Sequence, residues 1–127
     1  GAKFTGALST GDLAVALASL DVLVHPGEEL TCAHTLRQAA ASGVPVVAPR
    51  AGGAPAVVAH LRTGFLYDPR QEHGLRNALA AVVGDRQRSL LGEHARVWAR
   101  QRSWTQAVDE LVARHHSVLL DSQTRAA

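Results

Sequence analysis

Short runs of apolar residues alternate along the chain with longer stretches in which apolar residues recur every three or four positions. The short runs predict β-strands, and the longer stretches predict amphipathic α-helices. Runs that fit strands are found at residues 3–6, 21–25, 45–49 and 64–69. The second and third of these runs are almost continuously apolar, which is typical of strands covered on both faces in a parallel sheet. Strands that alternate with helices predict right-handed crossovers, so the sequence favours an α/β domain built on a parallel sheet.

Local signals mark where two of the helices begin and end. Ser9 is followed three residues later by Asp12, a capping box that predicts a helix from the residue after Ser9. Thr31 is the expected N-cap of the next helix. We expect that helix to end at Gly43, because the glycine is followed closely by Pro45.

The second half of the chain is predicted to be largely helical. A short helix is expected over residues 55–60, and apolar stripes predict helices over residues 75–83 and 90–98. Ser103 and Gln106 form a second capping box, which predicts the start of the last helix.

Length and composition fit one globular domain. The 127 residues are 46% apolar and carry a net charge of +2, which excludes general disorder and gives no indication of nucleic-acid binding. We expect the domain to span residues 1–120 and to be followed by a frayed tail over residues 121–127. No apolar run approaches the roughly 20 residues of a membrane span. The single cysteine, Cys32, rules out an internal disulfide and fits the reducing cytoplasm.

A cluster of basic residues lies in the predicted helices near the C-terminus. Its members surround a single acid, Glu93, and they are Arg86, Arg88, Arg96, Arg100 and Arg102. A solvated helix face explains most such runs. The alternative is an edge that contacts anionic lipid at the inner face of a membrane. The absence of Met and the opening "GAKFTG", already inside a predicted strand, favour a piece of a longer protein.

Parallel α/β sheets bind ligands at the carboxyl ends of their strands. This rule brings three loops together at one edge, and they span residues 25–31, 48–53 and 67–70. No carboxylate–histidine cluster in the sequence has metal-ligand spacing, and the adjacent His115 and His116 do not share a helix face. We therefore expect a ligand site without a metal at this edge.

Two motifs carry a resemblance to a known family, "DVLVHP" at residues 21–26 and "ASGVPVVAPRAGG" at residues 41–53. The chain resembles the C-terminal domain of retaining glycosyltransferases of the GT-B fold, the glycogen-synthase-like and mannosyltransferase-like group. The resemblance covers residues 4–69, with a looser match at residues 103–104. It implies a Rossmann-like three-layer domain that forms half of a GT-B fold.

The resemblance also implies an activity. In this family the domain holds a nucleotide-sugar donor, here a UDP- or GDP-hexose, and an N-terminal domain of the same longer chain supplies the acceptor side. The hexose passes with retention to a saccharide or lipid-linked acceptor, without a metal or other cofactor. In the family, two strands with an Arg and Lys phosphate clamp precede the segment that matches residues 3–6, and this sequence contains neither strand.

The family pattern places two glutamates, separated by seven residues, before the "ASGVP" motif. Counted back from Ser42, these two positions hold Leu30 and Gln38. The resemblance implies that the first acid contacts the donor sugar and the second contacts the ribose hydroxyls. Gln38 keeps hydrogen-bonding groups without the charge, whereas Leu30 makes no polar contact with a sugar. A one-residue shift of the loop would bring Glu29 to the sugar as the catalytic carboxylate.

Backbone groups complete the expected substrate site. Amide N–H groups of Thr31, Cys32 and Ala33 would face the sugar or the phosphate from a helix N-terminus, which suits a diphosphate. Gly52 and Gly53 fit a close approach of the backbone to a ligand, or an ordinary turn.

Other interpretations stay open. His25 ends a strand at this edge and either contacts the ligand or is a structural histidine. The replaced acids favour a degenerate, non-catalytic GT-B domain that acts as a partner or scaffold module. An unrelated doubly wound nucleotide binder is a third possibility, although the sequence has neither a G-x-G-x-x-G nor a Walker motif.

Overall fold

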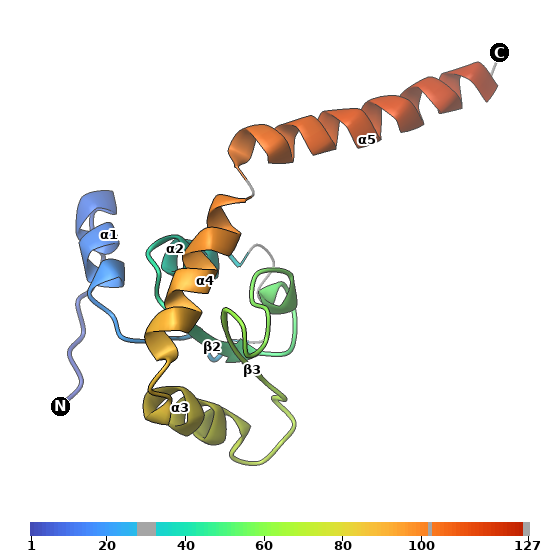
Figure 1. Cartoon of the computed structure of the whole chain (residues 1–127). Helices are drawn as coiled ribbons and strands as arrows, with labels where there is room; N and C mark the ends of the chain where they lie inside the picture. Colours follow the sequence, from blue (N-terminus) through green and yellow to red (C-terminus); the bar gives the residue numbers. More distant parts are fainter. Residues whose placement is uncertain (28–32, 102, 126–127) are drawn as a thin grey trace.

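The computed structural model describes residues 1–27, 33–101 and 103–125, and it shows a small sheet with helices on both faces (Figure 1). In chain order the elements are α1 (Thr10–Ala18), β1 (Leu23–Val24), α2 (His34–Ala41), β2 (Val46–Pro49), the 3₁₀ turn η1 (Ala54–Ala56), β3 (Gly64–Tyr67), α3 (Gly74–Gly84), α4 (Arg88–Arg100) and α5 (Trp104–Arg125). The α/β fold predicted from the sequence is confirmed. The apolar stripes at residues 75–83 and 90–98 lie within α3 and α4.

The three strands of the sheet are parallel and lie in the order β1-β2-β3. Val46 of β2 lies opposite Leu23 of β1 and Gly64 of β3. Three of the four predicted strands are therefore confirmed, with shorter bounds. The prediction of a strand at residues 3–6 is wrong. Residues 1–9 are exposed and lie beside no described strand, so nothing there supplies the hydrogen bonds of a ladder.

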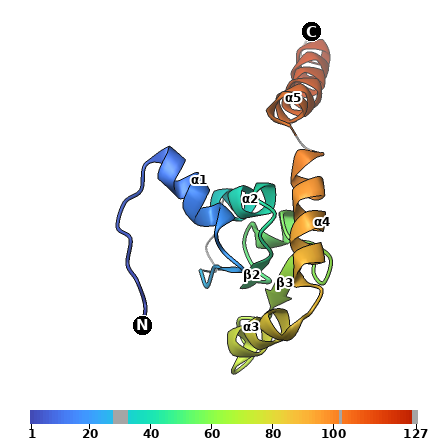
Figure 2. The same ribbon diagram turned by 60° about the vertical axis from the view of Figure 1, so that its left-hand side comes forward.

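The two faces of the sheet are covered by different helices. Val46 packs on one face in a cluster with Leu36 of α2, which is fully buried. Val47 packs on the other face with Val82 of α3 and Leu91 of α4. α4 also lies along α2, whereas α5 extends away from these layers in both views (Figures 1 and 2). The core is thus a three-layer arrangement built mainly from Ala, Val and Leu.

The outer edge of β3 is closed by the turn that precedes the strand. The Leu66 backbone N–H donates a hydrogen bond to Nδ1 of His60 at 2.9 Å, and the Leu61 N–H donates to the Gly64 carbonyl at 2.8 Å. Partial burial, and to a smaller extent the positive charge of Arg50, lower the pKa of His60 below its ordinary value. The lowered pKa favours the neutral ring, which is the form whose Nδ1 accepts a hydrogen bond.

The capping box at Ser103 is confirmed in both of its bonds, and Ser9 is confirmed as the N-cap of its helix. Ser9 Oγ accepts a hydrogen bond from the Asp12 N–H at 3.2 Å, and α1 begins at the next residue. At the start of α5, the Ser103 N–H donates to the Gln106 side chain at 2.9 Å and the Gln106 N–H donates to Ser103 Oγ at 3.1 Å. No glycine or proline follows within α5, and the helix continues to Arg125, past the start of the expected frayed tail.

Two helix predictions differ from the structure. α2 begins at His34, and the N-cap is Ala33 rather than Thr31, because Ala33 has the left-handed φ of 46° and ends the preceding loop. The helix expected over residues 55–60 is only the short turn η1. It does not continue because the chain turns back towards β3: the Ala59 N–H donates to Thr63 Oγ1 at 2.9 Å rather than to a helical carbonyl, and His60 pairs with Gly64.

Gly43 ends α2 as predicted. It has a φ of 76°, its N–H donates to the Ala40 carbonyl at 3.0 Å, and the Val44 N–H donates to the Ala39 carbonyl at 2.9 Å. These two bonds form a Schellman motif, which satisfies carbonyl groups at the helix end. Gly92 of α4 packs directly on the Gly43 carbonyl, so this turn also positions α4 against α2.

Candidate functional site

The carboxyl ends of the three strands meet at one edge of the sheet, as the sequence predicts. After β1, the His25 N–H donates to the Val47 carbonyl at 2.9 Å, and after β2 the Arg50 N–H donates to the Tyr67 carbonyl at 2.7 Å. The Tyr67 hydroxyl also lies 3.5 Å from the Pro26 carbonyl oxygen, to which it donates. The loops that follow the three strands therefore share one edge, which we call the carboxyl edge.

α2 follows β1 in the chain, and in a crossover between parallel strands the helix starts at the edge where the preceding strand ends, here the carboxyl edge. Ala33 provides no side-chain cap, and the first turn contains no acidic residue. The N–H groups of His34, Thr35 and Leu36 are the first of the helix and lie outside its internal hydrogen-bonding pattern, and the helix dipole gives this end a partial positive charge. The helix that the sequence predicts to supply such donors thus begins at His34, and the role of the predicted donors Thr31, Cys32 and Ala33 stays a prediction.

Several predicted site residues lie outside the described residues, and they are Glu29, Leu30, Thr31 and Cys32. Of the three predicted amide donors, only Ala33 is described. Its methyl group is buried in the same cluster as Leu36. The contacts that the sequence predicts between these residues and a donor stay predictions.

Gln38 lies in the second turn of α2, about 6 Å along the helix axis from its first residue. It is half-buried beside the buried Ala39. The Gln38 backbone carbonyl accepts hydrogen bonds from the N–H and the hydroxyl of Ser42, at 3.0 and 2.9 Å. Its side-chain amide forms no hydrogen bond with any described residue, so among these residues nothing competes with a ligand for it.

The predicted glycine pair follows β2 at the same edge. Gly52 has a φ of 55°, a conformation that favours glycine, and Gly53 is the N-cap of η1. Neither N–H donates to an acceptor among the described residues. The pair forms the tight turn that the sequence indicates, and its contact with a ligand stays a prediction.

His25 lies at the end of β1 and is half-buried. Its ring packs on its own loop, because a Cβ atom added to Gly27 would lie 3.0 Å from His25 Nε2. This packing explains the glycine at position 27 and fits a structural histidine. It does not test the alternative, a contact between His25 and a ligand.

Asp68 and Arg70 are charged residues at the carboxyl edge to which sequence reasoning gave no role. The Asp68 carboxylate accepts hydrogen bonds from the Arg70 N–H at 2.9 Å and from Arg70 Nε at 3.3 Å. The backbone hydrogen bond is the main cause that lowers the pKa of Asp68, and the guanidinium groups of Arg70 and Arg50 lower it further. The run Asp68, Pro69 and Arg70 could have predicted this turn, because an aspartate side chain often accepts a hydrogen bond from the backbone N–H two residues later.

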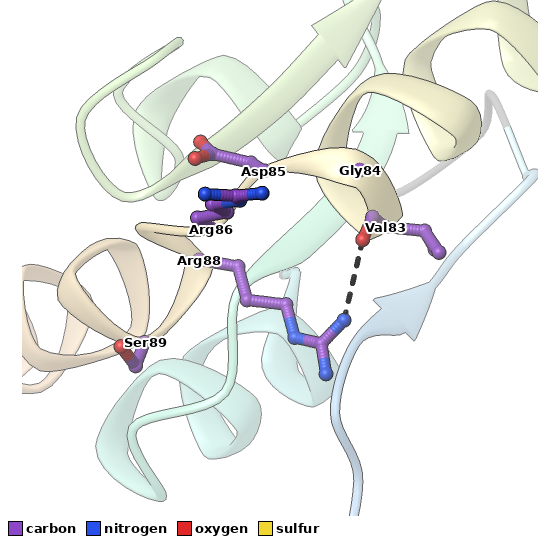
Figure 3. A pocket seen from close by; sticks show the side chains of 6 residues that line it. All are labelled: Val83, Gly84, Asp85, Arg86, Arg88 and Ser89. Carbon is purple, nitrogen blue, oxygen red and sulfur yellow. Dashed lines mark hydrogen bonds between the residues drawn. The ribbon is translucent and has the colours of Figure 1, made fainter.

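A pocket at the opposite edge of the sheet lies between the end of α3 and the start of α4 (Figure 3). It is lined by Val83, Gly84, Asp85, Arg86, Arg88 and Ser89. The Arg88 guanidinium donates to the Val83 carbonyl at 3.3 Å and pairs with Asp21, just before β1, at 3.2 Å. Because this arginine is held by its own chain at the amino ends of the strands, the pocket is not the site that the sequence predicts.

Groups of three or more His, Cys, Asp and Glu side chains able to hold a metal ion are absent from residues 1–27, 33–101 and 103–125. In the same part of the chain, no helix combines the length and apolar character needed to cross a membrane.

The parallel α/β fold with its carboxyl edge is that of a domain of the GT-B glycosyltransferases, as the solved structures below show. The family model described as "Glycosyl transferases group 1" matches residues 1–85. The chain belongs to this family, which confirms the resemblance seen in the sequence.

Curated relatives and solved structures agree with this assignment. The chain is 44% identical over 127 residues to a GDP-mannose-dependent alpha-mannosyltransferase of Mycolicibacterium smegmatis, and this match covers 99% of the chain and 33% of the relative. It is 34% identical to a sulfoquinovosyl transferase of Arabidopsis thaliana, covering 94% of the chain and 24% of the relative. The chain thus spans about a third or less of the length of these relatives.

Among solved structures, a sucrose-phosphate synthase from Thermosynechococcus elongatus has a TM-score of 0.75 and 26% identity, with 98% of this chain and 31% of that chain covered. The HepE protein of Anabaena in complex with UDP and glucose has a TM-score of 0.70 and 28% identity, with 84% of this chain and 29% of that chain covered.

Proposed function

We propose that the chain is the donor-binding part of a hexosyltransferase that uses a nucleotide-sugar. The observation that carries this proposal is the N-terminus of α2 at the carboxyl edge, whose N-cap Ala33 has no capping side chain and whose first turn contains no acid. The first amides of a helix and its partial positive charge suit a diphosphate. The Gly52 N–H, which donates to no acceptor among the described residues, adds a donor at the same edge.

GDP-mannose is the first donor to test, and UDP-glucose is the second. Two curated relatives, 44% and 42% identical and from M. smegmatis and Mycobacterium tuberculosis, are both called GDP-mannose-dependent. HepE of Anabaena has been solved with UDP-glucose. In the proposed complex Gln38 holds the ribose, and the backbone of residues 31–33 and 52–53 surrounds the sugar phosphate. Glu29 supplies the carboxylate that position 30 lacks, and His25 borders the sugar.

The remaining parts of the proposal concern the whole protein. Transfer proceeds with retention and without a metal, from a donor held here to a saccharide or lipid-linked acceptor. The acceptor side is supplied by an N-terminal domain of the same longer chain, in the cytoplasm or at the inner face of a membrane. A lipid-linked acceptor is supported by a 33% identical relative, a phosphatidylinositol monomannoside mannosyltransferase of M. tuberculosis.

Gln38 also favours a second candidate function, a non-catalytic domain that serves as a partner or scaffold module. On α2 an uncharged amide occupies the position where the family has its second acid. A charged hydrogen bond to ribose exceeds a neutral one by about 1 kcal/mol. Donor affinity is the property that separates the two functions.

Isothermal titration calorimetry of the chain with GDP, GDP-mannose and UDP tests the proposal. We expect measurable binding of at least one nucleotide at millimolar concentration, and no detectable heat with any of them would overturn the proposal. Leu30→Glu combined with Gln38→Glu is expected to tighten donor binding by about fivefold or more. Ala113→Glu, which adds an acid on α5, is the matched control and is expected to leave the affinity unchanged. An unchanged affinity in the double variant would favour the scaffold function.

A further inference from the structure

Two polar side chains lie on the open face of α2. His34 is the first residue of this helix and is exposed, and Gln38 follows four residues later. Residues spaced by four share one face of a helix. The opposite face is the buried one, because it carries Leu36, Ala39 and Ala40. His34 and Gln38 therefore form a polar pair on one face, separated by about 6 Å along the helix axis.

The geometry of a helix directs the His34 side chain past the end of α2. Every Cα–Cβ bond in an α-helix tilts toward the helix N-terminus. A side chain on the first residue thus extends beyond the first backbone amides, into the space where those amides hold an anion. The Gln38 side chain tilts in the same direction, toward His34.

No described residue competes with a ligand for the His34 imidazole. It forms neither a hydrogen bond nor an ion pair with any residue that the structure describes, whereas the exposed His73 lies 3.4 Å from a carboxylate oxygen of Glu72. The first turn of α2 contains no acid. An imidazole carries at least one N–H donor in either protonation state, and its hydrogen bond to a charged phosphate oxygen is stronger than a neutral one.

We propose that the His34 side chain binds the outer phosphate of the nucleotide-sugar and so sets how strongly the chain prefers a nucleoside diphosphate to a monophosphate. This inference rests on the proposed function, because that function supplies the nucleotide and places its ribose at Gln38. The phosphates are attached to the ribose, so a ribose at the second turn of α2 leaves them beside the first turn. The backbone amides of that turn remain in any variant, whereas the imidazole is removed by substitution.

A nuclear magnetic resonance titration of the 127-residue chain with GDP, GMP, UDP and UMP tests the inference. For each base, the dissociation constant of the monophosphate divided by that of the diphosphate measures the contribution of the outer phosphate. A change that weakens the whole site equally cancels from this ratio. We expect His34→Leu to reduce the ratio by about fivefold or more, because a hydrogen bond to a charged group is lost. His34→Ala serves the same purpose if the leucine variant does not fold.

Two further variants complete the comparison. His34→Gln keeps an N–H donor, and we expect its ratio to stay within about twofold of that of the unchanged chain. His94→Leu is the matched control, because His94 is exposed on α4 two residues after Gly92, which packs on the turn that ends α2. A substitution at that distant end is expected to change the ratio by less than about twofold.

Three results would overturn the inference. If nucleotides bind and His34→Leu changes the ratio no more than His94→Leu does, the inference is wrong and the proposed function stands. A loss in His34→Gln as large as that in His34→Leu would show that the hydrogen-bond donor has no role. If the unchanged chain binds none of the four nucleotides, the proposed function fails and the inference fails with it.

Discussion

Replacing Gly92 by alanine tests how closely α4 packs on the end of α2. A Cβ atom at position 92 would overlap the Gly43 carbonyl oxygen, and it would lie 2.9 Å from the Gly43 carbonyl carbon and 3.2 Å from Pro45 Cδ. The Gly43 carbonyl cannot move aside easily. Its turn is fixed by hydrogen bonds to the last turn of α2, at 3.0 and 2.9 Å. α4 must therefore shift away from α2 to accept even one methyl group.

Two opposing terms decide the size of the effect. Alanine is favoured over glycine in a helix interior by about 1 kcal/mol. Inserting a methyl group into a tightly packed contact costs about 1–3 kcal/mol, and rigid backbone places this contact at the upper end. We therefore expect Gly92→Ala to lower the free energy of unfolding by about 1–2 kcal/mol.

Gly84 provides the matched control. It is the last residue of α3, and a Cβ atom there meets nothing within 4 Å. Gly84→Ala is thus expected to leave stability unchanged or to raise it by up to about 1 kcal/mol. Urea unfolding followed by circular dichroism at 222 nm, a standard helix signal, measures both variants. If Gly92→Ala is as stable as Gly84→Ala, the close contact between α4 and the Gly43 turn does not exist in solution.

Two further predictions concern the turn before β3. Leu61 has a φ of 63° and is 61% exposed, so Leu61→Gly relieves about 1–2 kcal/mol of backbone strain at the expense of about 0.5–1 kcal/mol of chain entropy. We expect a gain in the free energy of unfolding of up to about 1 kcal/mol in urea, and a loss would show that the leucine side chain contributes packing there. Folding lowers the pKa of His60 below its unfolded value of about 6.5. The contribution of the neutral ring to stability is therefore fully present above the unfolded pKa, and it is lost as the pH falls through the folded pKa. The decline in stability between about pH 7 and pH 5 is expected to be smaller in His60→Leu than in the unchanged chain, and an identical decline in both would refute the role of this ring.

The fold was largely predictable because its signals are local. Ser9 and Ser103 begin helices through hydrogen bonds to residues three positions away, and Gly43 ends one through its own backbone conformation. Each of these features is contained within a few residues of sequence. The prediction of a strand at residues 3–6 failed because a strand needs a neighbouring strand to pair with. A short apolar run in the sequence does not show whether such a neighbour is present.

The sequence predicted at which edge of the sheet the candidate site lies, but it did not predict the helix start at that edge correctly. The rule for parallel sheets placed the loops after β1, β2 and β3 at one edge, and the structure confirms this. The sequence predicted Thr31 as the N-cap of α2, whereas the N-cap is Ala33. Alanine rarely adopts the left-handed φ that Ala33 has, so the residue type does not predict this helix start. The helix expected after Pro55 is cut short by the hydrogen bond from the Ala59 N–H to Thr63 Oγ1, which the residues from Pro55 to His60 do not reveal.

The hydrogen bonds that His60 and Leu61 make with β3 make the two margins of the sheet unequal. On the β3 side, the Leu66 N–H and the Gly64 carbonyl, which face away from β2, already bond to the preceding turn, so an incoming strand finds fewer partners there. On its side away from β2, β1 has no neighbour among the described strands, and Val24 is 37% exposed. The margin beside β1 is therefore the more accessible place for a further strand to pair, and strand addition beside β3 is disfavoured.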